Sequence, residues 1–295
     1  MPAALRLLPV PLLSLLLAAC GGGGDAVVSL MPGGTTVGEG DNGLGNATSG
    51  TEIRDTTGQR ITATAARATG SAAARITVPV TLDAGFFDGD LDGTLEIGGE
   101  TVTFTDGVGR LDGDEVVITY AEGRTGTYAA AFGATVFAAD PIEYGLVAGY
   151  ETDEGVVDDY STGGATYDGE FVAYGQSIQG ADRQEGVEMD GRLVVTFTFV
   201  GTHSVTADLT GLYTHDGSDV NLLLTLPASD FDGNDFAGSL SCNGGGCTSS
   251  ASSIEGTFYG PAIEELGGVL ALDATAGGVR YIGAGTYLIT DPTRD

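Results

Sequence analysis

The sequence of 295 residues contains no tryptophan and no lysine, so all 11 of its basic residues are arginines. Against them stand 41 acidic residues, which give a formal net charge of −30 at pH 7. A surface this acidic repels the phosphates of nucleic acids and of anionic lipids. Nucleic-acid binding is therefore excluded, whereas basic ligands remain compatible with the composition.

No hydrophobic run reaches the roughly 20 residues that a transmembrane helix needs. The apolar run 7–17 is short, follows the weakly basic start at Arg6 and leads into Leu17-Ala18-Ala19-Cys20. Such a run is typical of a signal peptide, and its ending resembles the bacterial lipobox, in which the cysteine is lipidated. We therefore expect a signal peptide at 1–19 and a lipid anchor on Cys20 that attaches the protein to the outer membrane. The alternative is an ordinary signal peptide that happens to contain cysteine.

Catalytic motifs are missing as well. The sequence has no Gly-x-Ser-x-Gly nucleophile elbow, no His-Glu-x-x-His zinc motif, no phosphate-binding loop and no dinucleotide fingerprint. A pair of catalytic carboxylates has no fixed spacing in sequence, and none is marked out among the 41 acidic residues. We expect the protein not to be an enzyme, and a hydrolase is the least favoured hypothesis.

Glycine, in contrast, is abundant, with 50 residues. Residues 20–50 are rich in Gly, Thr and Asn and carry too little apolar surface to offset the entropy of ordering, which predicts a flexible tether. From residue 51 on, short runs of alternating apolar and polar residues are separated by Gly, Asp and Asn, without helical periodicity longer than one turn. This pattern indicates an all-β fold.

Strands are expected in two regions, separated by an acidic, Gly-rich linker at 151–164. The N-terminal β-rich region, 51–150, has candidate strands at 72–82, 93–97, 101–104, 115–120, 127–137 and 144–150. The C-terminal region, 165–290, has eight candidates at 166–174, 191–200, 203–211, 219–226, 236–241, 252–259, 268–274 and 279–289. Eight sequential strands with short loops predict an antiparallel up-and-down β-barrel that closes on itself. A membrane-spanning barrel is disfavoured, because most strands are too short and aromatic girdles are absent.

The remaining cysteines and the two histidines predict no metal centre. Cys242 and Cys247 are five residues apart, and in an oxidising exterior we expect them to form a disulfide that closes a small loop. His203 and His215 fall in turns at opposite ends of a meander, so a shared metal site is not expected. Either histidine alone offers an axial bond to haem, and the sequence singles out neither.

Two acidic loops match the start of a calcium-binding loop. Residues 88–93 place acidic side chains at positions one, three and five and Gly at six, and residues 230–235 repeat the early spacing. In both, the twelfth position lacks the bidentate acid that such loops need. We expect solvated turns, and no metal or other cofactor is predicted.

The stretch 254–269 is the most specified part of the chain. Ile254, Gly256 and Phe258 alternate with more polar residues, which is typical of a half-buried strand. Gly260-Pro261 ends this strand, and Pro261 fits the first position of a helical turn that Gly267 would stop in a left-handed conformation. The stretch therefore predicts a strand, one helical turn and a second strand opening at Gly268.

The same residues carry a family resemblance. Phe258-Tyr259-Gly260-Pro261, two further residues, and then Glu264-Glu265-Leu266-Gly267-Gly268 resemble the signature of the C-terminal β-barrel of transferrin-binding protein B and its relatives, a family of bacterial surface lipoproteins. The chain departs from the family at Ile263 and Glu264, where small residues are usual. The positions that match the signature are structural and are Gly256, Phe258, Tyr259, Gly260, Pro261, Glu265, Leu266, Gly267 and Gly268.

The resemblance implies a binding protein on the cell surface. Relatives carry a β-rich handle before the barrel, which assigns that role to 51–150 by analogy. The implied function is iron acquisition, in which haem or an iron-carrying protein is captured and passed to an outer-membrane receptor. A structural or adhesive envelope lipoprotein without a small-molecule ligand is the alternative, since a fold by itself does not fix a ligand.

Overall fold

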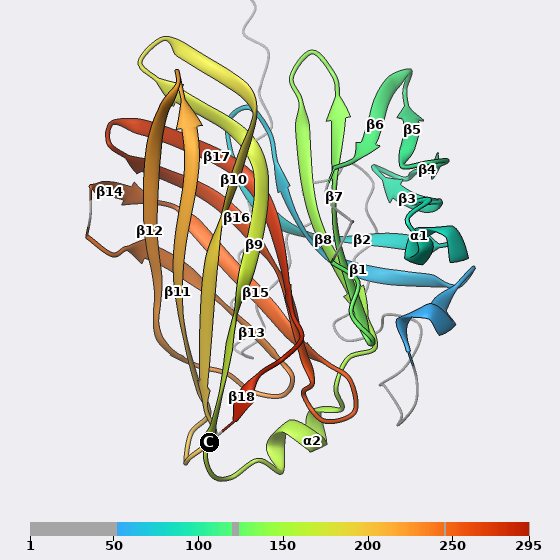
Figure 1. The fold of residues 1–295 in the computed structure, drawn as a ribbon, viewed down its shortest axis with the longest axis vertical. Coiled ribbons are helices and arrows are strands. Elements are labelled where there is room, and N and C mark those ends of the chain that lie inside the picture. Colours follow the sequence, from blue (N-terminus) through green and yellow to red (C-terminus); the bar gives the residue numbers. More distant parts are fainter. Residues whose placement is uncertain (1–51, 120–123, 245, 295) are drawn as a thin grey trace, which may run out of the picture.

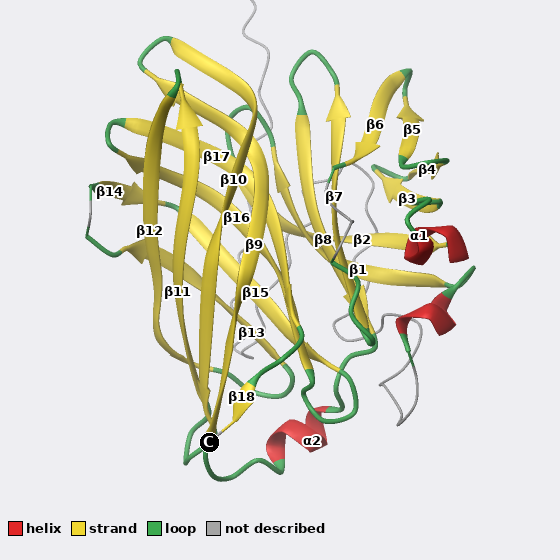
Figure 2. Cartoon of the chain, viewed as in Figure 1, coloured by secondary structure: helices red, strands yellow, loops and turns green. Residues whose placement is uncertain are grey.

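The computed structural model describes residues 52–119, 124–244 and 246–294. The predicted signal peptide, Cys20 and the tether lie outside the described residues. Two β structures stand side by side, the N-terminal one in blue and green and the C-terminal one in yellow to red (Figure 1). Helix is confined to three short pieces, η1 (Ile53–Thr56), α1 (Ala84–Asp88) and α2 (Glu154–Asp158), so the described chain is all-β as predicted (Figure 2).

The N-terminal structure, called the first sheet below, has eight antiparallel strands in the order β4-β3-β2-β1-β8-β7-β6-β5. Its edge strands meet at one tight turn through a bridge between Thr105 and Val108, so the sheet curls around a core of its own. The strands are β1 (Arg60–Ala68), β2 (Ala73–Leu82), β3 (Gly93–Ile97), β4 (Glu100–Phe104), β5 (Val108–Leu111), β6 (Asp114–Ile118), β7 (Ala129–Phe137) and β8 (Ile142–Gly149).

The sequence prediction omits two of these strands, β1 and β5. Strand β1 consists largely of alanine and threonine, and alanine is depleted in strands, so its signal is weak. Its small residues have a packing reason: Ala63 and Ala65 face the first sheet's own core, whereas Ala66 and Ala68 face the C-terminal structure. A strand buried on both faces loses the alternation by which strands are recognised.

The C-terminal structure is a closed barrel, and the predicted eight-stranded barrel is confirmed. Each of the eight candidates overlaps one strand of the ring, and closure is complete because β9 pairs with both β10 and β17. The ring strands are β9 (Gly164–Gln179), β10 (Asp182–Thr198), β11 (Ser204–His215), β12 (Ser218–Asp230), β13 (Asp235–Cys242), β15 (Ser252–Tyr259), β16 (Glu265–Ala276) and β17 (Val279–Ile289). Two short strands lie outside the ring: β14 (Cys247–Ser250) pairs with β16, and β18 (Thr293–Arg294) pairs with β9.

Burial along the barrel strands depends on what covers their outer face. Strand β11 alternates strictly between buried and exposed residues, because its outer face meets solvent. Strands β16 and β17 are buried almost throughout, because the first sheet packs on their outer face. The continuous apolar and glycine-rich character of β16 and β17 is thus explained by a second layer, as in sheets covered on both sides.

The turn between β15 and β16 differs from the sequence prediction. Residues 260–263 form a turn and not a helical turn, and β16 already begins at Glu265, opposite Tyr259. The left-handed residues are Gly260 (φ 91°) and Ile263 (φ 54°), whereas Gly267 lies inside β16, paired with Thr257. The Glu264 carboxylate accepts a hydrogen bond from the Ala262 N–H at 2.7 Å, which favours this tighter reversal.

Candidate functional site

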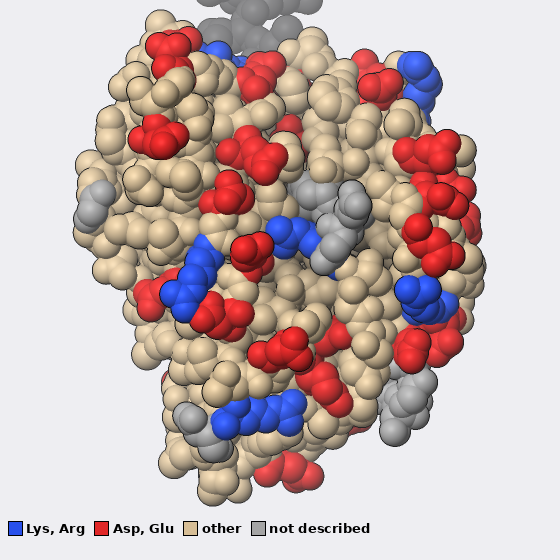
Figure 3. Space-filling model, viewed as in Figure 1, with Lys and Arg blue, Asp and Glu red and all other residues tan. Residues whose placement is uncertain are grey.

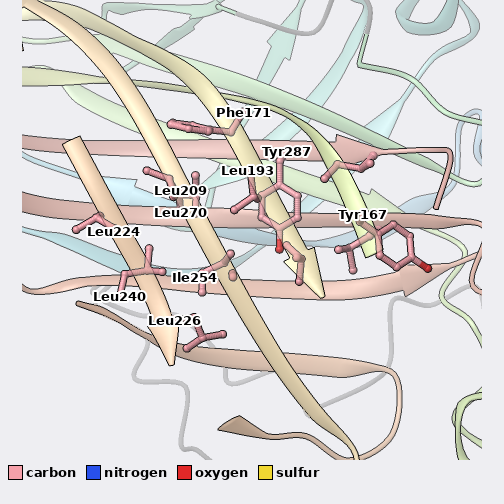
Figure 4. Packing of buried hydrophobic residues seen from close by; sticks show 14 of the residues in the cluster. Tyr167, Phe171, Leu193, Leu209, Leu224, Leu226, Leu240, Ile254, Leu270 and Tyr287 are labelled. Carbon is pink, nitrogen blue, oxygen red and sulfur yellow. The ribbon is translucent and has the colours of Figure 1, made fainter. Parts of the chain in front are cut away.

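The interior of the barrel is filled with side chains. Figure 4 shows labelled residues from several strands, among them Tyr167, Leu193 and Tyr287, packed on one another inside the ring. The ring of Phe258 has no exposed surface and lies 4.6 Å from that of Phe197, centroid to centroid. An eight-stranded barrel is just wide enough to be filled in this way. The described interior therefore leaves no chamber of haem size.

Four residues of the family signature contribute to this filling. Phe258 and Leu266 are inward-facing core residues. Gly256 and Gly268 also face inward, and a Cβ atom at either would lie within 2.3 Å of the Tyr287 hydroxyl oxygen. That hydroxyl donates to the Glu255 carbonyl at 2.9 Å. The glycines are therefore needed to let a tyrosine cross the barrel.

The other strand-borne residues of the signature face outward, toward the first sheet. Tyr259 is only 2% exposed and packs with Val147 of β8 and small residues from both structures. A Cβ atom at Gly267 would lie 2.7 Å from a methyl carbon of Val147. Burial is the main cause that raises the pKa of Tyr259 well above its ordinary value. Tyr259 therefore belongs to a covered surface and is unavailable to a ligand from solvent.

Glu265 makes the most specific of these outward contacts. Its carboxylate accepts hydrogen bonds from the backbone N–H groups of Thr127 (2.6 Å), Tyr128 (3.1 Å) and Ala129 (2.9 Å), at the start of β7. Burial raises the pKa of Glu265, and the three backbone donors oppose that rise because they favour the ionised form. Glu265, a residue of the signature on the barrel, therefore binds the first sheet through three hydrogen bonds.

The contact between the two structures, called the junction below, is rich in alanine and glycine. Gly145 of β8 approaches Gly285 of β17 so closely that a Cβ atom on Gly145 would lie 2.2 Å from the Gly285 carbonyl oxygen. An ion pair between Arg75 and Glu255 adds a polar contact across it. Its buried apolar members are Ala66, Ala68, Ala129, Ala131, Val147, Tyr259, Val269, Ala271, Ile282 and Ala284.

The two histidines lie at opposite ends of the barrel, as expected. At one end, the His203 ring lies against Phe231, its Nε2 is 3.0 Å from the Tyr160 carbonyl oxygen, and a shallow hollow nearby is lined by Asp158, Asp230 and Asp232. At the other end His215 is buried, with Nδ1 2.8 Å from the Ser177 hydroxyl. Nε2 of His203 and both ring nitrogens of His215 contact protein groups, so binding of haem iron at these atoms would need a rearrangement.

The group around His215 has the composition of a hydrolase triad but not its accessibility. His215 Nε2 lies 3.3 Å from a carboxylate oxygen of Asp182, on the far side of the ring from Ser177. Ser177, however, has no exposed surface. A nucleophile must reach its substrate within about 3.5 Å. Ser177 and His215 therefore form a buried polar contact beside the exposed Asp182, and the buried hydroxyl offers no site for acyl transfer.

The predicted disulfide is present. Cys242 and Cys247 are joined with an S–S distance of 2.05 Å and connect the end of β13 to the start of β14. Gly244 and Gly246 within this loop have positive φ angles, which glycine adopts without strain. The disulfide thus closes a loop tip at the edge of the barrel.

The two acidic loops are used as turns. Asp92 accepts a hydrogen bond from the Asp106 N–H at 2.8 Å, and Asn234 donates to the Thr152 carbonyl oxygen at 2.8 Å. Within the described residues, no three His, Cys, Asp or Glu side chains are grouped so that they could hold a metal ion. A search of the same residues for a helix able to cross a membrane finds none.

Acidic side chains are spread over the face drawn in Figure 3, with the arginines between them. Several arginines of the described residues are held in ion pairs, such as Arg192 with Asp168 and Arg183 with Asp140. Exposed acidic positions occur on both the first sheet and the barrel. The outer surface therefore suits a broad basic partner better than a small ligand in a pocket.

Comparison with known proteins finds a family match for the barrel. Residues 161–285 match the family described as the C-lobe and N-lobe beta barrels of Tf-binding protein B. Among solved structures, transferrin binding protein B from serogroup B Neisseria meningitidis is 14% identical to this chain, with a TM-score of 0.42. The match covers 80% of this chain and 44% of that protein's chain. A double mutant of the transferrin binding protein B vaccine antigen from Haemophilus parasuis is 16% identical, with a TM-score of 0.45. That match covers 80% of this chain and 46% of the other.

The chain thus spans less than half the length of these structures. A search of curated proteins finds no match.

Proposed function

We propose that this protein is a non-enzymatic binding module at the outer membrane, with an iron-carrying protein as its ligand. The match of residues 161–285 to the barrels of transferrin-binding protein B supports this proposal. The lipobox ending at Cys20 supports attachment through a lipid, with the described residues displayed at the cell surface. From there the captured ligand passes to an outer-membrane receptor.

One observation favours a protein over haem as the ligand. The interior of the barrel is packed with side chains, and the hollows at its ends are open and lined in part by polar residues such as Asp230, Asp232 and Asp219. Haem sites are enclosed and largely apolar, because burial of the porphyrin supplies most of the affinity. A protein ligand needs no chamber and can use loop tips and strand faces.

The charge of the surface favours a basic partner face. A formal charge of −30 steers a positively charged protein toward the barrel and speeds its association at low salt. Binding of this kind weakens as ionic strength rises. A salt-independent complex would contradict this part of the proposal.

The test is direct binding with the purified protein. Transferrin and other iron-carrying proteins are immobilised separately, and binding is measured by surface plasmon resonance at several salt concentrations. A saturable, salt-sensitive complex with one of them is expected. Failure to bind any, together with a Soret shift on haem titration, would overturn the proposal in favour of haem capture. Failure in both assays would favour the structural or adhesive alternative.

Orientation needs a separate experiment. Protease added to intact cells is expected to cleave the protein, as a surface-displayed lipoprotein would be. Full protection in intact cells, with cleavage after the outer membrane is permeabilised, would place the protein on the periplasmic face and contradict surface display.

A further inference from the structure

Strand β2 has an edge that only part of β3 covers. On one side, β1 pairs with β2 from Ala73 to Thr81, whereas on the other side β3 joins it only at Val80, Thr81 and Leu82. On the β3 side, residues 73–78 have no strand partner within the part of the chain that the structure describes. The backbone N–H and C=O groups of such an edge are able to pair with a further strand. Residues 73–78 are called the open edge below.

The barrel surface beside the open edge continues the junction. Arg75 of the open edge forms an ion pair with Glu255 of β15, which places the edge next to that strand. On the outer face of the barrel, one row of cross-strand neighbours runs from Ala271, which the first sheet covers, to Ser253 and Ser239. Ala271 is buried, Ser253 is partly exposed and Ser239 is exposed. Because these side chains are all small, the row leaves room for a strand that extends the first sheet past the open edge.

The chain itself contains a segment suited to this edge. The first described residues lie beside the same strand, because the Gly58 N–H donates to the Leu82 carbonyl oxygen at 2.9 Å. Upstream, residues 26–31 read Ala-Val-Val-Ser-Leu-Met and form the apolar run of the expected tether. Valine is enriched in strands, and a run of six residues matches the length of the open edge.

The length of chain between this run and the described residues allows it to reach the edge. Residues 32–51 separate Met31 from Glu52, and an extended chain of about 20 residues spans up to about 70 Å. The whole of β2, with ten residues, is about 33 Å long. Because run and edge belong to one chain, the effective concentration of the run at the edge is on the order of millimolar, and weak pairing is sufficient.

We propose that residues 26–31 add a strand to the open edge of β2 and lie over the row of Ser253 and Ser239. The added strand extends the first sheet and enlarges the junction by continuing its packing on small residues. A partner segment of another protein is the less favoured occupant, because it lacks the advantage of a covalent connection.

The added strand also sets the orientation of the barrel at the membrane. Cys20 precedes residue 26 by six positions, so the expected lipid anchor is held within about 20 Å of the strand. The β15 side of the barrel is thereby drawn toward the membrane, and the outer face of β10, across the ring, is left for a partner. This orientation rests on the lipid anchor of the proposed function, whereas the strand itself does not.

Amide hydrogen exchange measured by NMR tests the added strand. The chain from residue 20 on is prepared with Cys20→Ser, so that it carries no lipid. Residues 26–31, and the N–H groups of the open edge that point away from β1, should exchange at least about tenfold more slowly than in Val28→Pro, as a docked population of about 90% requires. Proline at position 28 removes an N–H and prevents regular pairing.

Val37→Pro is the matched control, because it places proline in the same tether outside the run, and it should keep the slow exchange. Rapid exchange of residues 26–31 in the unaltered chain would overturn the proposal. Slow exchange at the open edge that Val28→Pro leaves unchanged would also overturn it, since another segment or a second copy of the chain would then cover β2.

Cysteine trapping gives an independent readout. With Val28→Cys and Thr77→Cys in one chain, a disulfide should form at least about tenfold faster than with Val28→Cys and Thr210→Cys, because Thr210 is exposed on β11, away from the open edge. Equal rates would mean that the segment has no preferred position on the surface, which contradicts docking. Neither experiment uses the lipid or a ligand, so a negative result here leaves the proposed function untouched.

Discussion

A carboxylate oxygen of Glu265 accepts a hydrogen bond from the backbone N–H of Ala129 at 2.9 Å, across 136 positions of sequence. Together with the bonds from Thr127 and Tyr128, it satisfies from the barrel side the N–H groups at the entry to β7. A residue of the family signature thus stabilises an element outside the barrel, which explains why an acid is buried here.

Glu265→Gln should therefore destabilise the protein by about 2 kcal/mol. Gln has nearly the same shape, but its amide group replaces one acceptor oxygen by a donor that faces backbone N–H groups, and hydrogen bonds to a charged acceptor contribute about 1.5–3 kcal/mol. The measurement is the urea midpoint by circular dichroism. Glu100→Gln is the matched control, and an equal midpoint for both variants would contradict the role of Glu265.

Gly145→Ala tests the close approach at the junction. The new Cβ atom would lie 2.2 Å from the Gly285 carbonyl oxygen, which belongs to backbone and cannot rotate away. Overpacking of this kind costs about 1–3 kcal/mol or more. Gly155→Ala in α2 is the control, because the nearest atom to its new Cβ would be a side-chain oxygen at 3.1 Å. Calorimetry should show a lower Tm for Gly145→Ala alone, and a Tm like that of the control would mean that the strands move apart without cost.

The pH dependence of stability should reflect Glu151. Burial, with the nearby charges of Asp235 and Glu154, raises the pKa of Glu151 to about 7. A raised folded-state pKa stabilises the protein below the unfolded value of about 4.5, and this stabilisation is lost as pH rises through 7. From pH 5 to 8, the unaltered protein should lose about 3 kcal/mol more stability than Glu151→Gln. Parallel pH profiles from urea unfolding would show that Glu151 is solvated.

The disulfide should contribute modestly. Replacing Cys242 and Cys247 together by serine is expected to lower the free energy of unfolding by at most about 2 kcal/mol, because the loop that the disulfide closes is short. Amide hydrogen exchange should increase at the ends of β13 and β14 and stay unchanged in β9. Loss of protection throughout the barrel would mean that the disulfide holds the whole domain and not only its tip.

The barrel could be predicted from sequence because its solvent-facing strands alternate. In β11, for example, Val205, Ala207 and Leu209 point inward and polar residues lie between them. Strand β1 was not predicted, because the barrel covers one of its faces and the core of the first sheet covers the other. Alanine therefore occupies both faces, and the alternation of apolar and polar residues is lost. The helical turn predicted after Pro261 is wrong, since φ values at Gly260 and Ile263 reverse the chain sooner.

The polar residues of the junction carry no local signal. The Glu265 carboxylate binds backbone N–H groups, which every residue except proline possesses, so no side chain at 127–129 marks the contact. Gln176 and Glu143 are likewise ordinary polar residues within strands until tertiary packing buries them together. Glycines inside apolar strands, such as Gly145 and Gly285, are the sequence feature that indicates a close approach of backbones.

The small residues of the junction also set how the protein meets a partner. Alanine and glycine have no side-chain rotamers to exchange, and the backbones of Gly145 and Gly285 approach closely, so we expect little relative motion of the first sheet and the barrel. A partner that touches both structures therefore binds a preorganised surface whose two halves are already aligned. The entropy of aligning the two halves would then be lost during folding and not a second time on binding.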